Sequence, residues 1–444
     1  MKKSLSILVA IILVMSLFTG CNKDKKTNTT SKVELTSEYE NSTELVGNPN
    51  ATGELKIAVS PQKTNADSLK VVFELFQELY PNIILKIDST SFDSKKFWTN
   101  LSSRNDIDLF FTPNDINATK AIQAGLIADM SDYFKQDTSF SYEEFNQVVL
   151  QGNNPEGKQY LIPLNYYFPL FITTKSMIKQ SGLNIDACND PYSTVEEFSR
   201  LTKDYNSSNS ECLPLYSFPS SSPSGYDFID YQNQKITIDS PEFKKYAQTV
   251  RTYLYNSFDR DSNKTLSYLR NKQTILYKNF RGLTEIIYAK ESLDKDDEMV
   301  IFPEHNVRGQ IQATAVEHIA VNNKSSNKQT AYAFIKFLLN AKVQAVISEQ
   351  SALSILPISN SALKLLLNQK MFSETVTINE KQKNSKNQFI NEFLELVNQV
   401  DGVNDDPKIY ELFEEFMLPF YKGTKSYEEC VKDAESKIQA YVFG

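Results

Sequence analysis

The chain has 444 residues and a formal net charge of −8 at pH 7, from 55 acidic and 47 basic side chains. This acidic balance argues against a nucleic-acid partner, because phosphates are recognised by basic patches. The chain has only two histidines, which are too few for a histidine-rich zinc site. It has four cysteines, and no pair of them has the spacing of zinc ligands. We therefore expect no metal and no cofactor.

The first twenty residues have the layout of a secretory signal. Two lysines give a positive start, and the apolar run from Leu5 to Phe18 is too short to span a bilayer. Gly20 precedes Cys21, as in the bacterial lipobox, although Phe18 stands where Leu is usual. We expect residues 1–20 to be removed and Cys21 to carry a lipid that anchors the protein to the outer face of the cell membrane. The alternative is an ordinary signal peptide whose cysteine is incidental.

A flexible tether is expected over residues 21–52. This stretch is rich in Asn, Thr, Ser, Lys and Glu and has almost no large apolar side chain, so burial cannot offset the entropy of ordering. Beyond it about 390 residues remain, which is more than one core usually supports, and two domains are expected. Short apolar runs alternate with amphipathic stretches there, which indicates an α/β architecture.

The body opens with a strand, a helix and a second strand. Leu55 to Val59 alternates as a strand, and Ile83 to Ile87 forms the next one. Between them, apolar side chains recur on one helical face until Pro81 ends the helix. The side chains of that face are Leu69, Val72, Phe73, Phe76 and Leu79.

Further along, two more strands and two helix starts are predicted. Ile107 to Phe111 is typical of a buried strand, and Leu161 to Pro163 of a short extended segment. Ser193 and Glu196 have the spacing of a capping box, and Ser240 followed by Pro and Glu opens a later helix. Trp98, the single tryptophan, falls in an amphipathic stretch and is expected in the core.

Several segments then match one known family in its own order. Glu54 to Ser60 and the helix ending in Tyr-Pro-Asn at residue 82 come first, followed by Asp106 to Phe111 with a Gly-Leu turn at residue 125. Gly157 to Pro163 is similar to the family's crossing segment. The chain resembles the extracellular solute-binding proteins of ABC importers, in particular those that bind sugars and oligosaccharides.

The resemblance implies an α/β, two-lobed type II periplasmic-binding-protein fold with hinge strands and a cleft between the lobes. Lobe one would comprise residues 53–164 plus 312–354, and lobe two residues 165–311 plus 355–444. The hinge would lie near Leu161 to Leu164 and Ile355 to Pro357. Solute bound in the cleft would stabilise a closed, monomeric protein that an ABC permease recognises. No bond is made or broken, so no enzyme is expected.

The family's geometry also indicates which residues bind the solute. They follow strand ends that face the cleft or lie at a helix start, and many are aromatic, because a ring stacks on the C–H face of a sugar. The predicted ligand residues are Gln62, Asp115, Tyr166, Tyr167, Tyr216, Phe218, Phe280, Arg281 and Tyr410.

Each of these predictions has a structural alternative. With 23 Tyr and 28 Phe in the chain, most aromatic side chains must pack in cores or lie on ordinary surface. Asp115 could equally cap the helix that follows it. Thr112 and Arg281 stand where relatives often have a stacking Trp, and an Arg in the cleft would favour an anionic solute over a neutral sugar.

Two further questions stay open at the level of sequence. Cys188 and Cys212 fall in one predicted lobe and could pair or remain free thiols, whereas Cys430 is expected to be a small core residue. The competing functions are a carbohydrate-active hydrolase and a ligand-binding sensor without a transporter. A Ser/His/Asp hydrolase would need His305 or His318, and no Gly-x-Ser-x-Gly motif is present, but a pair of carboxylates needs no motif.

Overall fold

The chain divides into two units, Met1–Leu45 and Val46–Gly444, and every residue that the structure describes belongs to the second. The structure is a computed structural model. The described residues are 52–59, 67–89, 97–112, 118–152, 154, 157–208, 228–230, 232–255, 271–272, 274–279, 282–292, 297–350, 355–370, 380–403 and 407–443.

The first three elements confirm the predicted strand, helix and strand. They are β1 (Gly53–Ala58), α3 (Asp67–Leu79) and β2 (Ile83–Asp88), with β1 and β2 parallel. The apolar face of α3 is buried, because Phe76 packs edge-on against two phenylalanine rings of a later helix. The Gln77 side chain closes the end of α3 by donating to the carbonyl oxygens of Tyr80 and Ile83 at 3.2 and 2.8 Å.

A seven-stranded mixed sheet contains β1 and β2. Its strand order is β11-β4-β10-β3-β1-β2, and β12 pairs with β10 as well. β1 is parallel to its neighbours β2 and β3, whereas β10 is antiparallel to β3 and β4. The other strands are β3 (Leu109–Phe111), β4 (Ile162–Tyr167), β10 (Ile311–Val321), β11 (Leu356–Pro357) and β12 (Val400–Val403).

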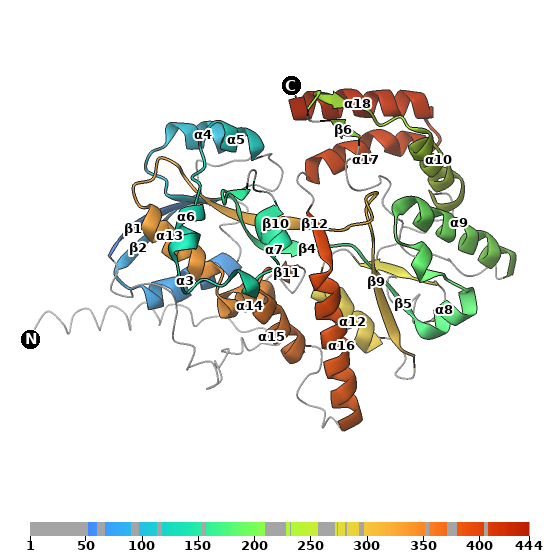
Figure 1. Cartoon of the computed structure of the whole chain (residues 1–444), viewed down its shortest axis with the longest axis horizontal. Helices are drawn as coiled ribbons and strands as arrows, with labels where there is room; N and C mark the ends of the chain where they lie inside the picture. The colour runs from blue at the N-terminus through green and yellow to red at the C-terminus, as the bar shows by residue number, and fades with distance from the viewer. Residues whose placement is uncertain are drawn as a thin grey trace, which may run out of the picture. The chain divides into compact units, whose positions relative to one another are not determined.

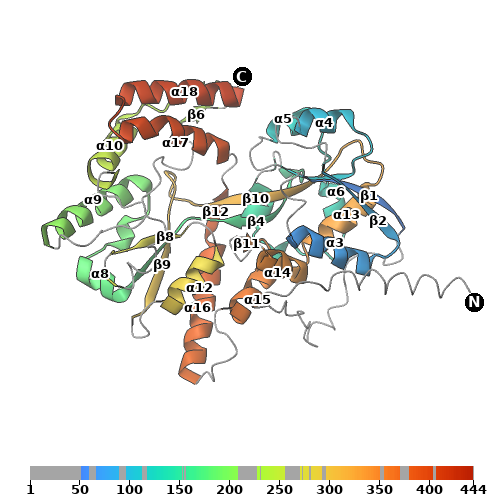
Figure 2. The ribbon, with the colours of Figure 1, turned by 180° about the vertical axis from the view of Figure 1, so that it is seen from behind.

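Helices from two distant parts of the chain accompany this sheet (Figures 1 and 2). Trp98 packs edge-on against Phe97 and Phe110 at the margin of the core under β3, so it contributes to the core as predicted but is only partly buried. The helices and one 3-10 turn are α4 (Phe97–Ser103), α5 (Thr119–Gln123), α6 (Ser131–Gln136), η2 (Tyr142–Glu144), α7 (Gln147–Gly152), α13 (Lys328–Leu338), α14 (Ala341–Gln350), α15 (Asn360–Lys370) and α16 (Glu380–Asn398).

A second, three-stranded antiparallel sheet has the order β8-β5-β9. Its centre is Phe171, which is fully buried against Phe198 and Phe302. The strands are β5 (Leu170–Thr174), β8 (Tyr277–Asn279) and β9 (Met299–Pro303), and a separate two-stranded hairpin consists of β6 (Ile229–Asp230) and β7 (Lys235–Ile236).

The helices of this second part include the C-terminal pair α17 and α18, which lie side by side in both views (Figures 1 and 2). The elements are α8 (Lys175–Ser181), η4 (Ile185–Ala187), α9 (Pro191–Ser208), α10 (Pro241–Thr249), the π-helical turn η5 (Val250–Tyr255), α12 (Leu283–Ser292), α17 (Pro407–Tyr421) and α18 (Tyr427–Phe443). The predicted start of α10 is confirmed, since the Ser240 hydroxyl accepts from the N–H of Phe243 at 3.0 Å.

The predicted capping box at Ser193 and Glu196 is wrong. α9 begins at Pro191, and its cap is the Asp190 carboxylate, which accepts from the backbone N–H groups two and three residues further on at 2.8 and 3.0 Å. Glu196 instead forms an ion pair with Lys245 of α10. An aspartate immediately before a helical Pro satisfies the free N–H groups as well as a capping box does.

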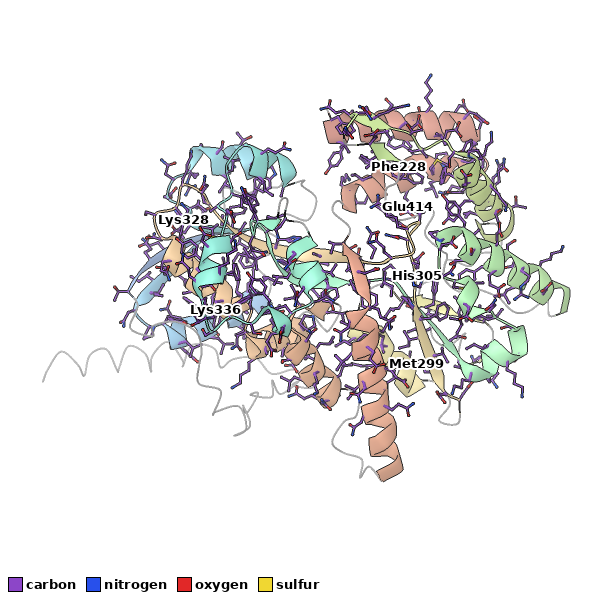
Figure 3. The ribbon with its side chains drawn as sticks, viewed as in Figure 1. Phe228, Met299, His305, Lys328, Lys336 and Glu414 are labelled. Atoms are coloured by element: carbon purple, nitrogen blue, oxygen red, sulfur yellow. The ribbon has the colours of Figure 1, made fainter. Side chains whose placement is uncertain are left out.

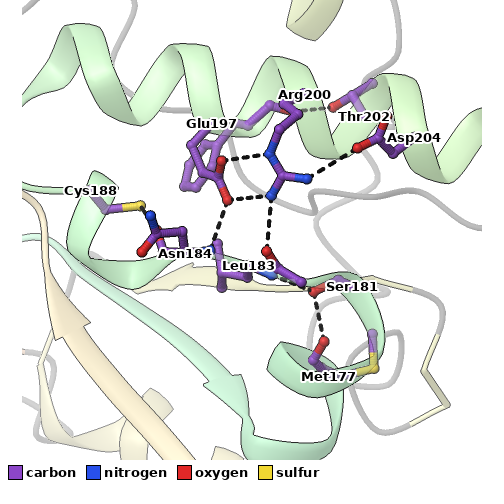
Figure 4. Close-up of polar contacts among 11 residues, drawn as sticks. Met177, Ser181, Leu183, Asn184, Cys188, Glu197, Arg200, Thr202 and Asp204 are labelled. Atoms are coloured by element: carbon purple, nitrogen blue, oxygen red, sulfur yellow. Dashed lines mark hydrogen bonds and ion pairs between the residues drawn. The ribbon is translucent and has the colours of Figure 1, made fainter.

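The turn between α8 and α9 is held by Glu197 and Arg200 (Figure 4). Glu197 is buried and accepts from the N–H of Asn184 at 2.8 Å, while Arg200 donates to Glu197, to Asp204 and to the carbonyl of Gly182. Burial alone would raise the pKa of Glu197, but these hydrogen bonds lower it. The carboxylate therefore stays charged and fixes the turn on α9.

Within the described residues, two short segments join the sheets. Residues 168–169 connect β4 to β5, and residues 304–310 connect β9 to β10. The segments touch, because the N–H of Glu304 donates to the carbonyl of Pro169 at 3.0 Å. The two predicted hinge stretches also meet, since Leu356 and Pro357 of β11 pair with residues 165–166 of β4.

The predicted lobe boundaries remain a prediction, but the contacts of residues 355–403 bear on them. β11 and β12 belong to the seven-stranded sheet, and α15 and α16 contact β11, α14 and β12. The described part of this stretch therefore packs with the sheet of β1, whereas α17 and α18 pack with η5 and β7.

Cys188 and Cys430 are buried free thiols. Cys430 is fully enclosed on α18, which confirms its expected place in the core. Cys188 donates weakly to the carbonyl of Asn184 at 3.7 Å, and burial is the main reason that its pKa is raised to about 12. Cys212 lies outside the described residues.

Candidate functional site

β1 and β3 end at the same edge of the seven-stranded sheet. Ile57 pairs with Leu109, and Ala58 with Phe110, so the loops that follow both strands leave from one place. In parallel arrangements of this kind, ligands bind at the carboxyl ends of the strands. The predicted ligand residues Gln62 and Asp115 belong to these two loops and lie outside the described residues.

Beyond this edge the sheet continues through β10 and β4. The N–H of Thr112, the first residue after β3, donates to the carbonyl of His318 at 3.0 Å. β10 pairs with β3 at residues 319–321, and its earlier residues extend beyond the end of β3 and pair with β4. The register of the β10–β4 pairing shifts on each side of Glu317. Such irregularities change the direction in which a side chain points and are common beside functional sites.

Asn165 and Glu317 meet at this level. They are paired residues of β4 and β10, and the Nδ2 atom of Asn165 donates to Oε2 of Glu317 at 3.0 Å. Asn165 is only 1% exposed, whereas Glu317 is half-buried. The Oδ1 atom of Asn165 is buried and has no hydrogen-bond partner among the described residues. Neither residue was predicted from the sequence, although Asn165 is the single amide in an otherwise apolar and aromatic strand.

The two predicted tyrosines of β4 lie on opposite faces, as alternation along a strand requires. Tyr166 is fully buried and stacks on Phe168 with ring centroids 6.4 Å apart, and burial raises the pKa of its phenol. Tyr167 is half-buried and falls on the face that carries Asn165. β4 therefore places Tyr167 on the face of the polar pair and Tyr166 in the core.

Tyr410 belongs to a different group of side chains, on α17. It is half-buried and lies close enough to Tyr246 of α10 to affect its ionisation. Burial is the main reason that the pKa of Tyr246 is raised well above its usual value, and Tyr421, Tyr410 and Glu304 contribute. Side chains from α10, α17 and the connection between β9 and β10 therefore lie near one another.

That connection is built around Asn306. The Oδ1 atom of Asn306 accepts from the N–H groups of Arg308 and Gln310, both at 2.9 Å, and closes a tight turn. Its neighbour His305, labelled in Figure 3, has Nδ1 3.1 Å from the carbonyl oxygen of Cys188. At the far end, the Asp401 carboxylate of β12 accepts from the N–H of Ile311 at 2.8 Å.

The other predicted ligand residues lie outside the described residues, as does Cys21. They are Gln62, Asp115, Tyr216, Phe218, Phe280 and Arg281. Their assignment to the site stays a prediction.

Among the described side chains, no cluster of three or more His, Cys, Asp or Glu could hold a metal ion. The described helices also include none that is long and apolar enough to cross a membrane.

Solved structures share this fold. The sugar-binding protein MalE from Xanthomonas citri is similar with a TM-score of 0.62 and 11% identity, over 87% of this chain and 97% of that one. A putative oligosaccharide periplasmic-binding protein from Synechococcus sp. MITs9220 gives 0.57 and 16%, over 87% and 98%. The GacH receptor of Streptomyces glaucescens, known unliganded and with acarbose, gives 0.54 and 16%, over 88% and 99%. No curated protein sequence matches this chain.

Two sheets joined by two crossing segments, with polar groups on the crossing strands, define a type II periplasmic-binding-protein fold. Residues 62–379 match the family of bacterial extracellular solute-binding proteins, and the chain belongs to this family. Proteins of this family act on the extracytoplasmic side of the membrane and bind a solute there, and the same holds for this chain.

Proposed function

We propose that this protein binds a sugar or oligosaccharide and delivers it to the membrane permease of an ABC importer. The observation that carries the proposal is the fold, which covers nearly the whole length of known sugar receptors, including MalE and the acarbose-binding GacH receptor. Tyr167 and the acceptors of Asn165 and Glu317 supply the aromatic and polar groups that sugar recognition requires.

The proposed mechanism is closure about the two crossing segments. A solute that contacts groups from both sheets has its highest affinity for the closed form, in which those groups are close together. Binding therefore stabilises the closed form. The closed protein is then the form that the permease binds. The role requires no chemical step, so we propose that the protein is not an enzyme and that it acts as a monomer.

The proposed location is the outer face of the cell membrane, with a lipid on Cys21. Two or more acyl chains anchor a protein stably without a spanning helix. The tether of residues 21–52 would keep the binding body close to its permease.

A thermal-shift screen of the purified mature protein tests the binding function. The panel contains maltose, acarbose and galactose, with glucuronic acid, galacturonic acid, a dipeptide and inorganic phosphate as alternatives. At a concentration 100 times its Kd, a ligand stabilises the folded state by about 2.7 kcal/mol, so the melting temperature should rise clearly for at least one sugar.

Chromatography of each sugar after incubation separates the binder from the hydrolase. We expect every sugar to be recovered unchanged. A cleaved product without a thermal shift would contradict the proposal and support the hydrolase. Co-purification of the ligand-loaded protein with a permease would distinguish an importer component from a sensor.

A further inference from the structure

We infer that Asn165 and Glu317 form a hydrogen-bond-accepting subsite for a hydroxyl group of a neutral sugar. The inference rests on the proposed function and narrows it, because it favours a neutral solute over an anionic one.

The first step is the geometry of the pair. Asn165 on β4 and Glu317 on β10 are 152 residues apart in sequence and face each other across the strands that cross from one sheet to the other. Because the Nδ2 atom of Asn165 donates to Glu317 at 3.0 Å, the orientation of the amide is set. Its other atom, Oδ1, must then be the acceptor that points away from Glu317.

The second step is the state of that acceptor. A buried oxygen without a partner destabilises a protein, because it has lost its hydrogen bonds to water and gained none in return. Two other buried asparagines of this chain have hydrogen-bond partners for both side-chain atoms. In Asn146, Nδ2 donates to Val397 and Oδ1 accepts from the N–H of Val149; in Asn322, Nδ2 donates to Arg104 and Oδ1 accepts from Lys324. Asn165 differs, since its Oδ1 has no partner among the described residues.

The third step is the position of the pair. It lies at the level where β3 ends and β10 continues, next to the hydrogen bond between Thr112 and His318. Tyr167 follows two residues later on the same face of β4 and is half-buried. An unsatisfied acceptor on the same strand face as an aromatic side chain, at the level where β3 ends, can position a hydroxyl of a stacked sugar.

The fourth step is the chemistry of the ligand. The two groups that meet here are an amide and a carboxylate, and both the amide oxygen and the carboxylate accept hydrogen bonds. A sugar hydroxyl can donate to either of them. A ligand carboxylate or phosphate has no proton to donate at neutral pH and would be repelled by Glu317, so the pair disfavours an anion at this point.

The test compares Asn165→Leu with Asn146→Leu in the full mature protein. Leu has nearly the shape of Asn, so each variant removes the polar atoms without opening a large cavity. Without ligand, Asn146→Leu should lower the melting temperature because it breaks two satisfied hydrogen bonds. Asn165→Leu should lower the melting temperature less than Asn146→Leu does, because it loses one hydrogen bond to the half-buried Glu317 but also removes a buried unsatisfied oxygen. An equal loss in both variants would show that Asn165 has a structural role and would overturn the inference, whether or not a sugar is known.

Calorimetric titration with maltose, galactose and galacturonic acid provides the second measurement. For the neutral sugar that the wild-type protein binds, Asn165→Leu should weaken affinity at least about tenfold. Glu317→Gln should also weaken the affinity for that sugar. It should improve the affinity for galacturonic acid, because it removes the negative charge that repels the acid. Wild-type binding of galacturonic acid alone, or full sugar affinity in Asn165→Leu, would overturn the inference. If no sugar binds the wild type, the proposed function fails, and the melting temperatures still decide whether the Asn165 acceptor is unsatisfied.

Discussion

Lys336 on α13 and Asp137 at the end of α6 form an ion pair inside the protein, with side chains only 5% and 14% exposed. The phenol of Tyr332 also donates to the Asp137 carboxylate, at 2.8 Å, and Lys336 donates to the hydroxyl of Ser139 at 2.6 Å. Lys336 is labelled in Figure 3. This pair joins two helices that are far apart in sequence.

Removing one partner should therefore be strongly destabilising. We expect Lys336→Met to lower the free energy of unfolding by about 3–5 kcal/mol, because it leaves a buried carboxylate without its counter-charge. Urea denaturation at pH 7 measures the change. The matched control is Lys425→Met, which removes an exposed ion pair with Asp433 and should have no measurable effect. Equal effects of both variants would contradict this account.

The same pair predicts how stability depends on pH. Burial alone would raise the pKa of Asp137, but hydrogen bonds from Lys336, Ser139 and Tyr332 outweigh it and lower the pKa to about 2. A carboxyl whose pKa is lower in the folded state stabilises the protein above its unfolded pKa of about 3.9. That contribution should be lost as pH falls from about 4 to about 2. The wild type should have a higher free energy of unfolding than Asp137→Asn at pH 7, and this difference should be smaller at pH 2.5. Urea denaturation at both pH values measures it. A difference that stays constant would contradict the lowered pKa of Asp137.

Local sequence signals predicted the fold where they act over a few residues. The apolar face of α3 and the Pro after it gave nearly the observed ends of this helix, and the Ser-Pro start of α10 was correct. The start of α9 was missed because two capping signals lie three residues apart, and Asp190, not Ser193, bonds to the helix N–H groups. Only the three-dimensional position of the side chain decides between them.

Substitution of this cap should be measurable. Asp190→Ala should lower the free energy of unfolding by about 1 kcal/mol, because two N–H groups at the start of α9 lose their acceptor. Ser193→Ala should have a smaller effect, since its hydroxyl donates to Asp190 and caps nothing itself. Thermal unfolding of the two variants measures the difference, and a larger effect for Ser193→Ala would restore the capping box.

The two tyrosines of β4 should respond differently to substitution. Tyr166→Ala removes a fully buried ring and should lower the free energy of unfolding by about 3–5 kcal/mol. Tyr167→Ala should leave stability nearly unchanged and weaken the affinity for the bound sugar about tenfold or more, because it removes a stacking surface. Calorimetric titration and urea denaturation of both variants separate the effects; unchanged affinity in Tyr167→Ala would remove this residue from the site.

Cys21→Ser should release the protein from the membrane. Without the thiol no lipid can be attached, so the full-length chain expressed in a bacterium should move from the membrane fraction to the soluble or secreted fraction. Immunoblots of the fractions measure this, with Cys430→Ser as the control that keeps the anchor. Retention of Cys21→Ser in the membrane would contradict the proposed lipid.

The polar pair of the candidate site could not be predicted from sequence, for a physical reason. Asn165 and Glu317 belong to no motif, and they meet only because β10 returns antiparallel to β4. The single amide in the strand Ile162–Tyr167 is a signal, but it does not say which residue lies opposite. Tyr166 and Tyr167 were both predicted as ligand residues from the family resemblance, and alternation along β4 places their side chains on opposite faces.

The strand order has a consequence for how the chain is made and exported. β3 lies between β1 and β10, so one side of β3 stays unpaired until residues 319–321 have been synthesised, and β10 gains β12 only after residue 400. Pairing over such distances requires closure of long loops before any contact can stabilise them, and is therefore slow. A chain that emerges from its N-terminus therefore cannot complete its first sheet before residue 400 has been made, which favours export before folding.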